Sequence, residues 1–354
     1  MQAPAPYPML LADIGGTNAR FACVQRSAGP IIAIQSFAIA DFPSPLEAIK
    51  HYRPRCLDMR LLGAERAEFR TAAIAVATPV RGDRVELTNG HWSFSTQSLR
   101  STLALDHCMV INDFEALALA LPYLQATQWR SFPGPQPGST QETLAVIGPG
   151  TGLGVAGLKK IGAGWVALAG EGGHATLSAA DEWEAQLIAW VRSRYPHVSA
   201  ERLLSGAGLP LLHEAVCALS GNSGKAPKTY HAADILDQLD RDPLCQETMA
   251  SFCALLGSFC GNVALMLGAR GGVFLAGGIL PRIQDFVINS QLQARFIAKG
   301  RFEAYLADIP LALITDTYAA FYGLSTALES QLATLNPVFS RKGPMASISR
   351  AAVG

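Results

Sequence analysis

The chain has 354 residues, of which 49% are hydrophobic and 16% are charged, a balance typical of a globular protein rather than a disordered one. At this length we expect two domains rather than one. Lysine plus arginine equals aspartate plus glutamate, at 28 each, so the composition gives no electrostatic reason to expect a nucleic-acid or membrane-surface partner.

Cysteine usage and the N-terminus point to a cytoplasmic protein. The seven cysteines are scattered without a CxxC pair, which argues against a disulfide framework and against a paired-cysteine zinc site. No basic segment precedes the first apolar stretch, so we expect no signal peptide. Residues 252–269 are uncharged, and as a helix they would span about 27 Å. They contain polar residues and glycines and have no flanking aromatic belt or basic cluster, so we expect a buried helix.

The predicted elements alternate between apolar, β-rich runs and helical stretches. In chain order the strands are predicted at residues 9–11, 20–24, 31–34, 72–77, 108–111, 144–147, 154–158, 165–168, 273–275 and 311–314. Several are uniformly apolar, which indicates strands covered on both faces. Helices are predicted from Pro45, over residues 113–124 and over residues 181–194. The alternation predicts an α/β fold, with a surface loop at residues 131–142 near a domain boundary and a frayed tail after Asn336.

Two distant segments repeat one design, in which a glycine-rich turn with a threonine joins two apolar strands. They are MLLADIGGTNARFACV, residues 9–24, and LAVIGPGTGLGVAGL, residues 144–158. Glycines let the backbone approach a ligand closely, and successive amides can form a nest for an anion. Neither turn is a Walker A loop or a dinucleotide fingerprint. Either turn alone could be an ordinary tight hairpin. The pair, with Asp13 in the first, favours two related halves that bind phosphate.

Asn112 and Asp113 stand where an apolar strand meets a helix. An aspartate at this junction is an ordinary helix N-cap, and it is also a usual place for a catalytic carboxylate in an α/β protein. In the second role it could orient a hydroxyl group and accept its proton.

Three further motifs carry polar side chains or glycines. GEGGHATLS places Glu171 and His174 around two glycines, where they could converge on one small polar ligand. Glu201, in SAERLLSG, is either a residue of a helix N-terminus or a ligand. Gly277 and Gly278 end a buried strand, either as a close-approach turn or as a simple link to a helix. Glycine turns, a junction aspartate and several groups that bind hydroxyls together fit phosphoryl transfer to a polyol.

Seven motifs in fixed order resemble the bacterial-type glucokinases of the hexokinase and actin-like sugar kinase superfamily. They are DIGGTNARF, TNGHWSFS, INDFEALALAL, GPGTGLGVA, GEGGHATLS, SAERLLSG and GGVFLAGGILPR. Together with the matching intervals between them, they cover nearly the whole chain from about Leu10 to Ala327. The resemblance implies a two-domain, actin-like (ribonuclease H-like) α/β fold with a cleft between a small and a large domain. The small domain would comprise residues 1–122 plus 315–336, the large domain residues 123–314, and residues 337–354 would form a flexible tail.

The same resemblance implies the reaction and its residues. The family phosphorylates glucose at the 6-hydroxyl with ATP and Mg²⁺, and its members are typically cytosolic homodimers. Asp113 would be the general base. Glucose would also contact Asn89, Asn112, Glu171, His174 and Glu201. The nucleotide would lie against Ala12, Asp13, Ile14, Gly15, Gly16, Thr17, Asn18, Gly150, Thr151, Gly152, Gly277 and Gly278. No residue is expected to bind a metal directly, and Asp13 would reach Mg²⁺ through water.

Departures from the family pattern are few, and alternatives stay open. Ala12 replaces a more usual glycine, Pro149 replaces a small residue, and the cysteine-rich zinc motif of the wider family is absent, so no structural zinc is expected. The alternatives are a kinase for a related hexose and a non-catalytic sugar-sensing regulator. A DNA-binding regulator would be expected to carry a helix-turn-helix domain before Asp13. A filament protein would leave Glu171, His174 and Glu201 unexplained. The sequence does not decide the tolerance for other hexoses or for donors other than ATP.

Overall fold

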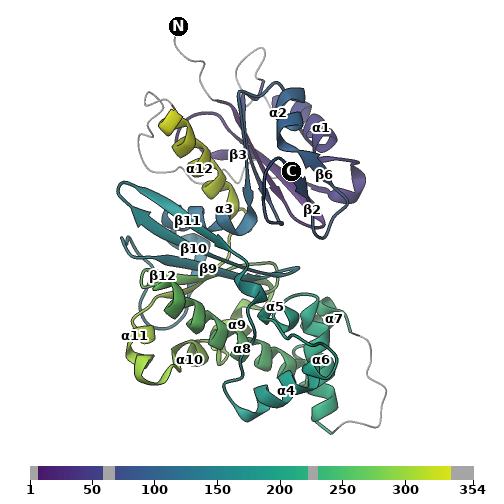
Figure 1. The fold of residues 1–354 in the computed structure, drawn as a ribbon, viewed down its shortest axis with the longest axis vertical. Helices are drawn as coiled ribbons and strands as arrows, with labels where there is room; N and C mark the ends of the chain where they lie inside the picture. The colour runs from purple at the N-terminus through teal and green to yellow at the C-terminus, as the bar shows by residue number, and fades with distance from the viewer. Residues whose placement is uncertain (1–6, 59–67, 222–229, 336–354) are drawn as a thin grey trace. The chain divides into compact units, whose positions relative to one another are not determined.

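A computed structural model describes residues 7–58, 68–221 and 230–335 of the chain (Figure 1). It divides into two compact units, of which the first comprises Met1–Gln125 with Thr317–Gly354 and the second comprises Ala126–Asp316. The tail expected at residues 337–354 lies outside the described residues.

The first unit is built on a five-stranded sheet with the order β3-β2-β1-β4-β7. Its strands are β1 (Met9–Ile14), β2 (Asn18–Val24), β3 (Ile31–Ala38), β4 (Thr71–Val76) and β7 (His107–Asn112). The first three pair antiparallel in sequence order, whereas β4 runs parallel to β1, and β7 runs parallel to β4. Strand β4 is buried at every residue and β1 at all but one, as their uniformly apolar sequences predict.

Helices and a small hairpin complete the first unit. They are η1 (Ile39–Asp41), α1 (Pro45–Asp58), β5 (Arg84–Glu86), β6 (Ser93–Ser95), α2 (Thr96–Thr102), α3 (Asp113–Ala120), η2 (Leu121–Tyr123) and α12 (Ala319–Leu335). Helix α12 comes from the far end of the chain and packs along α3 (Figure 1). At their crossing, a Cβ on Gly323 would lie 1.7 Å from the carbonyl oxygen of Ala116, so only glycine allows the two helices to approach this closely.

The sheet of the second unit repeats the topology of the first. It contains β8 (Trp129–Ser131), β9 (Leu144–Pro149), β10 (Leu153–Ile161), β11 (Gly164–Gly170), β12 (Gly272–Leu275) and β13 (Leu311–Ile314). The order β11-β10-β9-β12-β13 matches the first sheet, with three antiparallel strands followed by two parallel ones, and β8 adds an antiparallel edge strand. The expectation of two related halves is confirmed by this shared topology.

Most of the helices that the structure describes belong to the second unit. They are η3 (Ala126–Gln128), η4 (Gly172–His174), α4 (Glu182–Arg192), α5 (Ala200–Leu203), α6 (Gly208–Leu219), α7 (Ala232–Asp237), α8 (Pro243–Leu267), η5 (Leu280–Ile283), α9 (Gln284–Asn289), α10 (Leu292–Ile297), η6 (Gly300–Phe302) and α11 (Glu303–Ala307). Within the described residues, α8 is the one helix long and apolar enough to cross a membrane. Of its most apolar window, 72% is buried inside the protein, which confirms the expectation of a buried core helix.

Candidate active site

The first glycine turn is shorter than the segment assigned to it from the sequence. Ala12, Asp13 and Ile14 end β1 and Asn18 begins β2, so the turn itself is Gly15–Thr17. The amide of Gly15 donates to the carbonyl of Asn18 at 2.9 Å and closes the hairpin. A Cβ on Gly16 would lie 3.0 Å from the Cβ of Asn89, so this glycine lets Asn89 lie against the turn. The structure therefore brings Asn89 and the first turn together.

Asp13 forms an ion pair across the hairpin. It lies opposite Arg20 in the register of β1 and β2, and Nη1 of Arg20 is 3.3 Å from Oδ2 of Asp13. Arg20 also donates to the carbonyl of Thr317 at 3.2 Å. Burial raises the pKa of Asp13, and the guanidinium of Arg20 opposes that rise. Sequence reasoning did not single out Arg20, although a two-strand pairing centred on the turn would have placed it opposite Asp13.

Asn112 and Asp113 divide two roles that the sequence could not separate. Asn112 is the N-cap of α3, because its Oδ1 accepts from the amides of Phe114 at 2.9 Å and Glu115 at 3.3 Å. Its Nδ2 donates to the carbonyl of Thr78 at 3.4 Å. The interpretation of Asp113 as an ordinary N-cap is therefore wrong, because its neighbour performs that function. Asp113 is left as the first helical residue, where β7 ends.

The carboxyl group of Asp113 has a pKa raised to about 7. Burial is the main cause, and the nearby negative charge of Asp13 adds to it. The amide of Phe114 donates to Oδ1 of Asp113 at 3.0 Å and partly offsets the rise. A carboxyl group that titrates near neutral pH is suited to accept a proton from a substrate hydroxyl.

The raised pKa of Asp113 also predicts a dependence of stability on pH. The folded state binds this proton more tightly than the unfolded state, so ionisation of Asp113 destabilises the protein as the pH rises from about 4 to about 7. We expect Asp113→Asn to increase the free energy of unfolding at pH 8 by roughly 2–4 kcal/mol, since each pKa unit corresponds to about 1.4 kcal/mol. Urea unfolding at pH 4 and pH 8 would measure the effect. A gain of equal size at both pH values would contradict this explanation.

The second turn is anchored from two sides by the segment around α5. The amide of Gly150 donates to the carbonyl of Gly152 at 2.8 Å within the turn. The amide of Gly206 donates to the carbonyl of Gly150 at 2.8 Å, and the amide of Leu153 donates to Oε2 of Glu201 at 2.8 Å. Glu201 therefore binds the residue that follows the second turn, a link that its position in the first turn of α5 did not reveal.

His174 and Glu201 are brought together by contacts between their backbone segments. The amide of Ala200 donates to the carbonyl of Ala175 at 2.8 Å, which leaves Nε2 of His174 3.8 Å from Oε1 of Glu201. The turn that carries His174 lies tightly on β10, because a Cβ on Gly173 would be 2.1 Å from the carbonyl of Leu153. Glu171 begins the same turn as His174 and is exposed.

Gly277 lies against the second turn. Its φ is +90°, in the region that favours glycine, and a Cβ there would lie 2.3 Å from the carbonyl of Pro149. The amide of Ala276 donates to the carbonyl of Ile147 at 2.9 Å, which fixes this segment beside β9. Gly278 has open space where a side chain would be. The third glycine motif is thus a close-approach turn rather than a simple link.

The site residues fall into two groups, one in each unit. The first holds Asn89, Asn112, Asp113 and Asp13 with their turn, and the second holds Glu171, His174, Glu201 and Gly277 with theirs. In the part of the chain that the structure describes, no three histidine, cysteine or acidic side chains are grouped so as to hold a metal ion.

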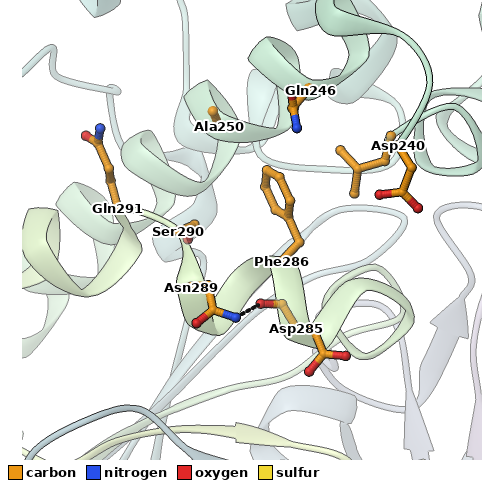
Figure 2. Close-up of a pocket in the computed structure, with 9 residues that line it drawn as sticks. Asp240, Gln246, Ala250, Asp285, Phe286, Asn289, Ser290 and Gln291 are labelled. Atoms are coloured by element: carbon orange, nitrogen blue, oxygen red, sulfur yellow. Dashed lines mark hydrogen bonds between the residues drawn. The ribbon is translucent and has the colours of Figure 1, made fainter.

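A hollow of about 490 Å³ in the second unit lies among α8, α9 and the segment after α7 (Figure 2). It is lined by Leu239, Asp240, Gln246, Ala250, Asp285, Phe286, Asn289, Ser290 and Gln291. None of the predicted site residues lines it. Its acidic and amide residues Asp240, Gln246, Asp285, Asn289 and Gln291 are exposed, so they form an open surface depression rather than an enclosed site.

The sequence profile of the glucokinase family matches residues 10–331. The chain belongs to the glucokinase family. The resemblance seen in the seven motifs is thereby confirmed, as is the prediction of an enzyme of this family.

Individual glucokinases agree with this assignment. The glucokinase of Chromobacterium violaceum is 45% identical over 332 residues, which are 93% of this chain and 92% of that protein. The crystal structure of a glucokinase from an Antarctic psychrotroph is 35% identical with a TM-score of 0.80, and the match covers 91% of this chain and 99% of that one. A glucokinase from Balamuthia mandrillaris, solved in complex with glucose, is 20% identical with a TM-score of 0.70 over 90% of this chain and 92% of its own, and it supports the fold alone.

Proposed function

We propose that the protein transfers the γ-phosphoryl group of ATP to the 6-hydroxyl of D-glucose, with Asp113 as the general base. The observation that carries this proposal is the position and chemistry of Asp113. It begins α3 at the end of a parallel strand, and its pKa of about 7 lets it be ionised and still basic at neutral pH. Membership of the glucokinase family supports the substrate pair.

The two glycine turns would bind the phosphates of ATP. Each turn joins two antiparallel strands and carries a threonine beside glycines, so backbone amides and a hydroxyl are available as donors. Such fixed donors stabilise the charge that spreads over the transferred phosphoryl group in the transition state. Gly277 and Gly278, beside the second turn, would lie near the adenosine.

The remaining polar groups would bind the sugar hydroxyls. In the second unit, His174 and Glu201 lie close enough to act on neighbouring hydroxyls, with Glu171 on the same segment. In the first unit, Asn89 lies against the first turn, and Asn112 directly precedes Asp113. Each hydroxyl left without a partner would cost on the order of 1–3 kcal/mol, so a set of acceptors of this kind favours a polyol substrate.

Asp13 is the residue best suited to hold Mg²⁺ through water. Mg²⁺ usually keeps several waters and takes one or two protein carboxylates together with substrate phosphates, which fits a single carboxylate beside the first turn. When bound, the ion would neutralise charge on the phosphates. Arg20 keeps the Asp13 carboxylate in place. An Asp13→Asn variant whose Mg²⁺ dependence equals that of the wild type would instead assign Asp13 to ordering the turn.

A kinase assay on the purified protein tests the proposal. Glucose, mannose, fructose and glucosamine would each be offered with ATP, ADP and polyphosphate, and hexose 6-phosphate would be measured. We expect glucose with ATP to be the best pair. Phosphorylation of none of the hexoses would overturn the proposal, while sugar binding without turnover would favour the sugar-sensing regulator.

The pH profile of the reaction tests the role of Asp113 separately. We expect kcat/KM for glucose to rise with pH and to level off above a pKa of about 7, because only the carboxylate accepts the proton. Asp13→Asn removes a negative charge that raises this pKa, so it should move the rise to lower pH. A profile that is flat between about pH 5.5 and about pH 8, or one that moves to higher pH in the variant, would contradict the assignment.

We further propose a cytoplasmic homodimer without nucleic-acid or membrane partners. The equal numbers of acidic and basic residues support the absence of polyanionic partners. The dimer follows from the family resemblance, and sedimentation equilibrium of the purified protein would test it.

A further inference from the structure

The two carboxylate oxygens of Glu201 serve different neighbours. Oε2 accepts the amide hydrogen of Leu153 at 2.8 Å, at the residue that follows the second turn. Oε1 lies 3.8 Å from Nε2 of His174, on the side where sugar ligands are proposed. The side chain of Glu201 is 32% exposed, so part of the carboxylate remains open to a ligand. One side chain thus connects the proposed phosphate turn to the proposed sugar ligands.

This connection requires glycine at position 152. A Cβ on Gly152 would lie 2.4 Å from Oε2 of Glu201, closer than real Cβ atoms approach any heavy atom. The backbone of Gly152 is not in the left-handed region that favours glycine. A side chain is therefore excluded at this position by lack of space and not by the backbone conformation. Any side chain here would push the carboxylate away from the amide of Leu153.

The first unit contains a comparable contact. Its turn glycine, Gly16, leaves room for Asn89, since a Cβ at this position would lie 3.0 Å from the Cβ and 3.2 Å from the carbonyl oxygen of Asn89. In each unit, therefore, a glycine of the proposed phosphate turn touches a residue assigned to the sugar. The arrangement recurs on two turns related by the shared topology of the sheets.

We infer that Gly152 and the amide of Leu153 position Glu201 for sugar binding, and that Glu201 in turn holds the second turn in shape for the nucleotide. The inference rests on the proposed function and adds positioning roles to it. A sugar that fixes Glu201 also fixes the turn, so glucose and the nucleotide should each raise the affinity for the other by the same factor.

Glucose binding to Gly152→Ala, measured by calorimetry without nucleotide, tests the first half. The substitution removes no group that would touch glucose, yet we expect the Kd for glucose to rise about tenfold because Glu201 is displaced. Gly164→Ala is the matched control, since Gly164 lies in the same sheet and a Cβ there would lie no closer than 4.0 Å to another heavy atom. It should bind glucose within about twofold of the wild type. An unchanged Kd for Gly152→Ala would overturn the inference.

A double-mutant cycle separates positioning from a general loss of structure. If Gly152 acts through Glu201, then Gly152→Ala should have no further effect on the glucose Kd in a Glu201→Ala background. If Gly152→Ala raised the glucose Kd by the same factor in the Glu201→Ala background as in the wild type, the inference would be overturned.

Nucleotide binding in Glu201 variants tests the second half without changing the turn itself. Without glucose, Glu201→Ala should weaken binding of AMPPNP several-fold, whereas Glu201→Gln keeps an oxygen for the amide of Leu153 and should retain wild-type binding. Equal binding by all three proteins would overturn the inference. If the wild type phosphorylates glucose and these variants behave like it, only the inference fails. If the wild type phosphorylates no hexose, the proposed function fails.

Discussion

Replacing Asp113 by alanine is expected to lower kcat for glucose phosphorylation by at least about 100-fold, because a positioned general base contributes at least that factor. The Kd for glucose should stay measurable, since the other proposed hydroxyl ligands remain. The amide of Phe114 donates to Asp113, but the N-cap of α3 is Asn112, so the helix start should survive the change. Turnover in a coupled assay and glucose binding by calorimetry measure the two parameters separately.

Glu115→Gln is the control for this prediction. Glu115 lies in the first turn of the same helix and also has a pKa raised by burial, yet it has no proposed role in the reaction. Its turnover should lie within about threefold of the wild type. Near-normal turnover in Asp113→Ala would remove Asp113 as the base. Asp113→Asn should be equally inactive while being more stable than the wild type at pH 8, a combination that global unfolding would not produce.

Replacing Gly323 by alanine is expected to lower the free energy of unfolding strongly. The added Cβ would lie 1.7 Å from the carbonyl oxygen of Ala116, and a backbone atom cannot rotate away as a side chain does. Helices α12 and α3 would have to separate, so we expect a loss of at least about 3 kcal/mol in the free energy of unfolding. Urea unfolding followed by circular dichroism would measure it.

Gln331→Ala, on the exposed side of the same helix, is the matched control and should change stability by no more than about 0.5 kcal/mol. Because α3 carries Asp113 at its first residue, the folded fraction of Gly323→Ala should also show a reduced kcat. A variant as stable as the wild type would show that α12 and α3 do not need their close crossing.

Local pattern was enough to place the sheets. All ten predicted strands are present, because runs of apolar, β-prone residues ending at glycine, aspartate or proline are read from neighbouring positions. The strands β5, β6 and β8 were not predicted, since three residues are too few to show a period. The helix expected over residues 113–124 ends as an α-helix at Ala120, and a 3₁₀ turn at Leu121–Tyr123 contains the proline that stops it.

The sequence by itself determined the α/β class, the paired glycine hairpins, the family and the position of Asp113 at the end of a strand. These follow from short-range pattern and from the order of motifs. Only the tertiary structure decided which groups touch, namely that Asn112 caps the helix, that Arg20 pairs with Asp13, and that Glu201 accepts from the amide of Leu153, just after the second turn and 48 positions away in the sequence. The physical reason is that such contacts depend on how close two remote backbones come, and that distance is set by packing, here by glycines at positions where a single Cβ would not fit.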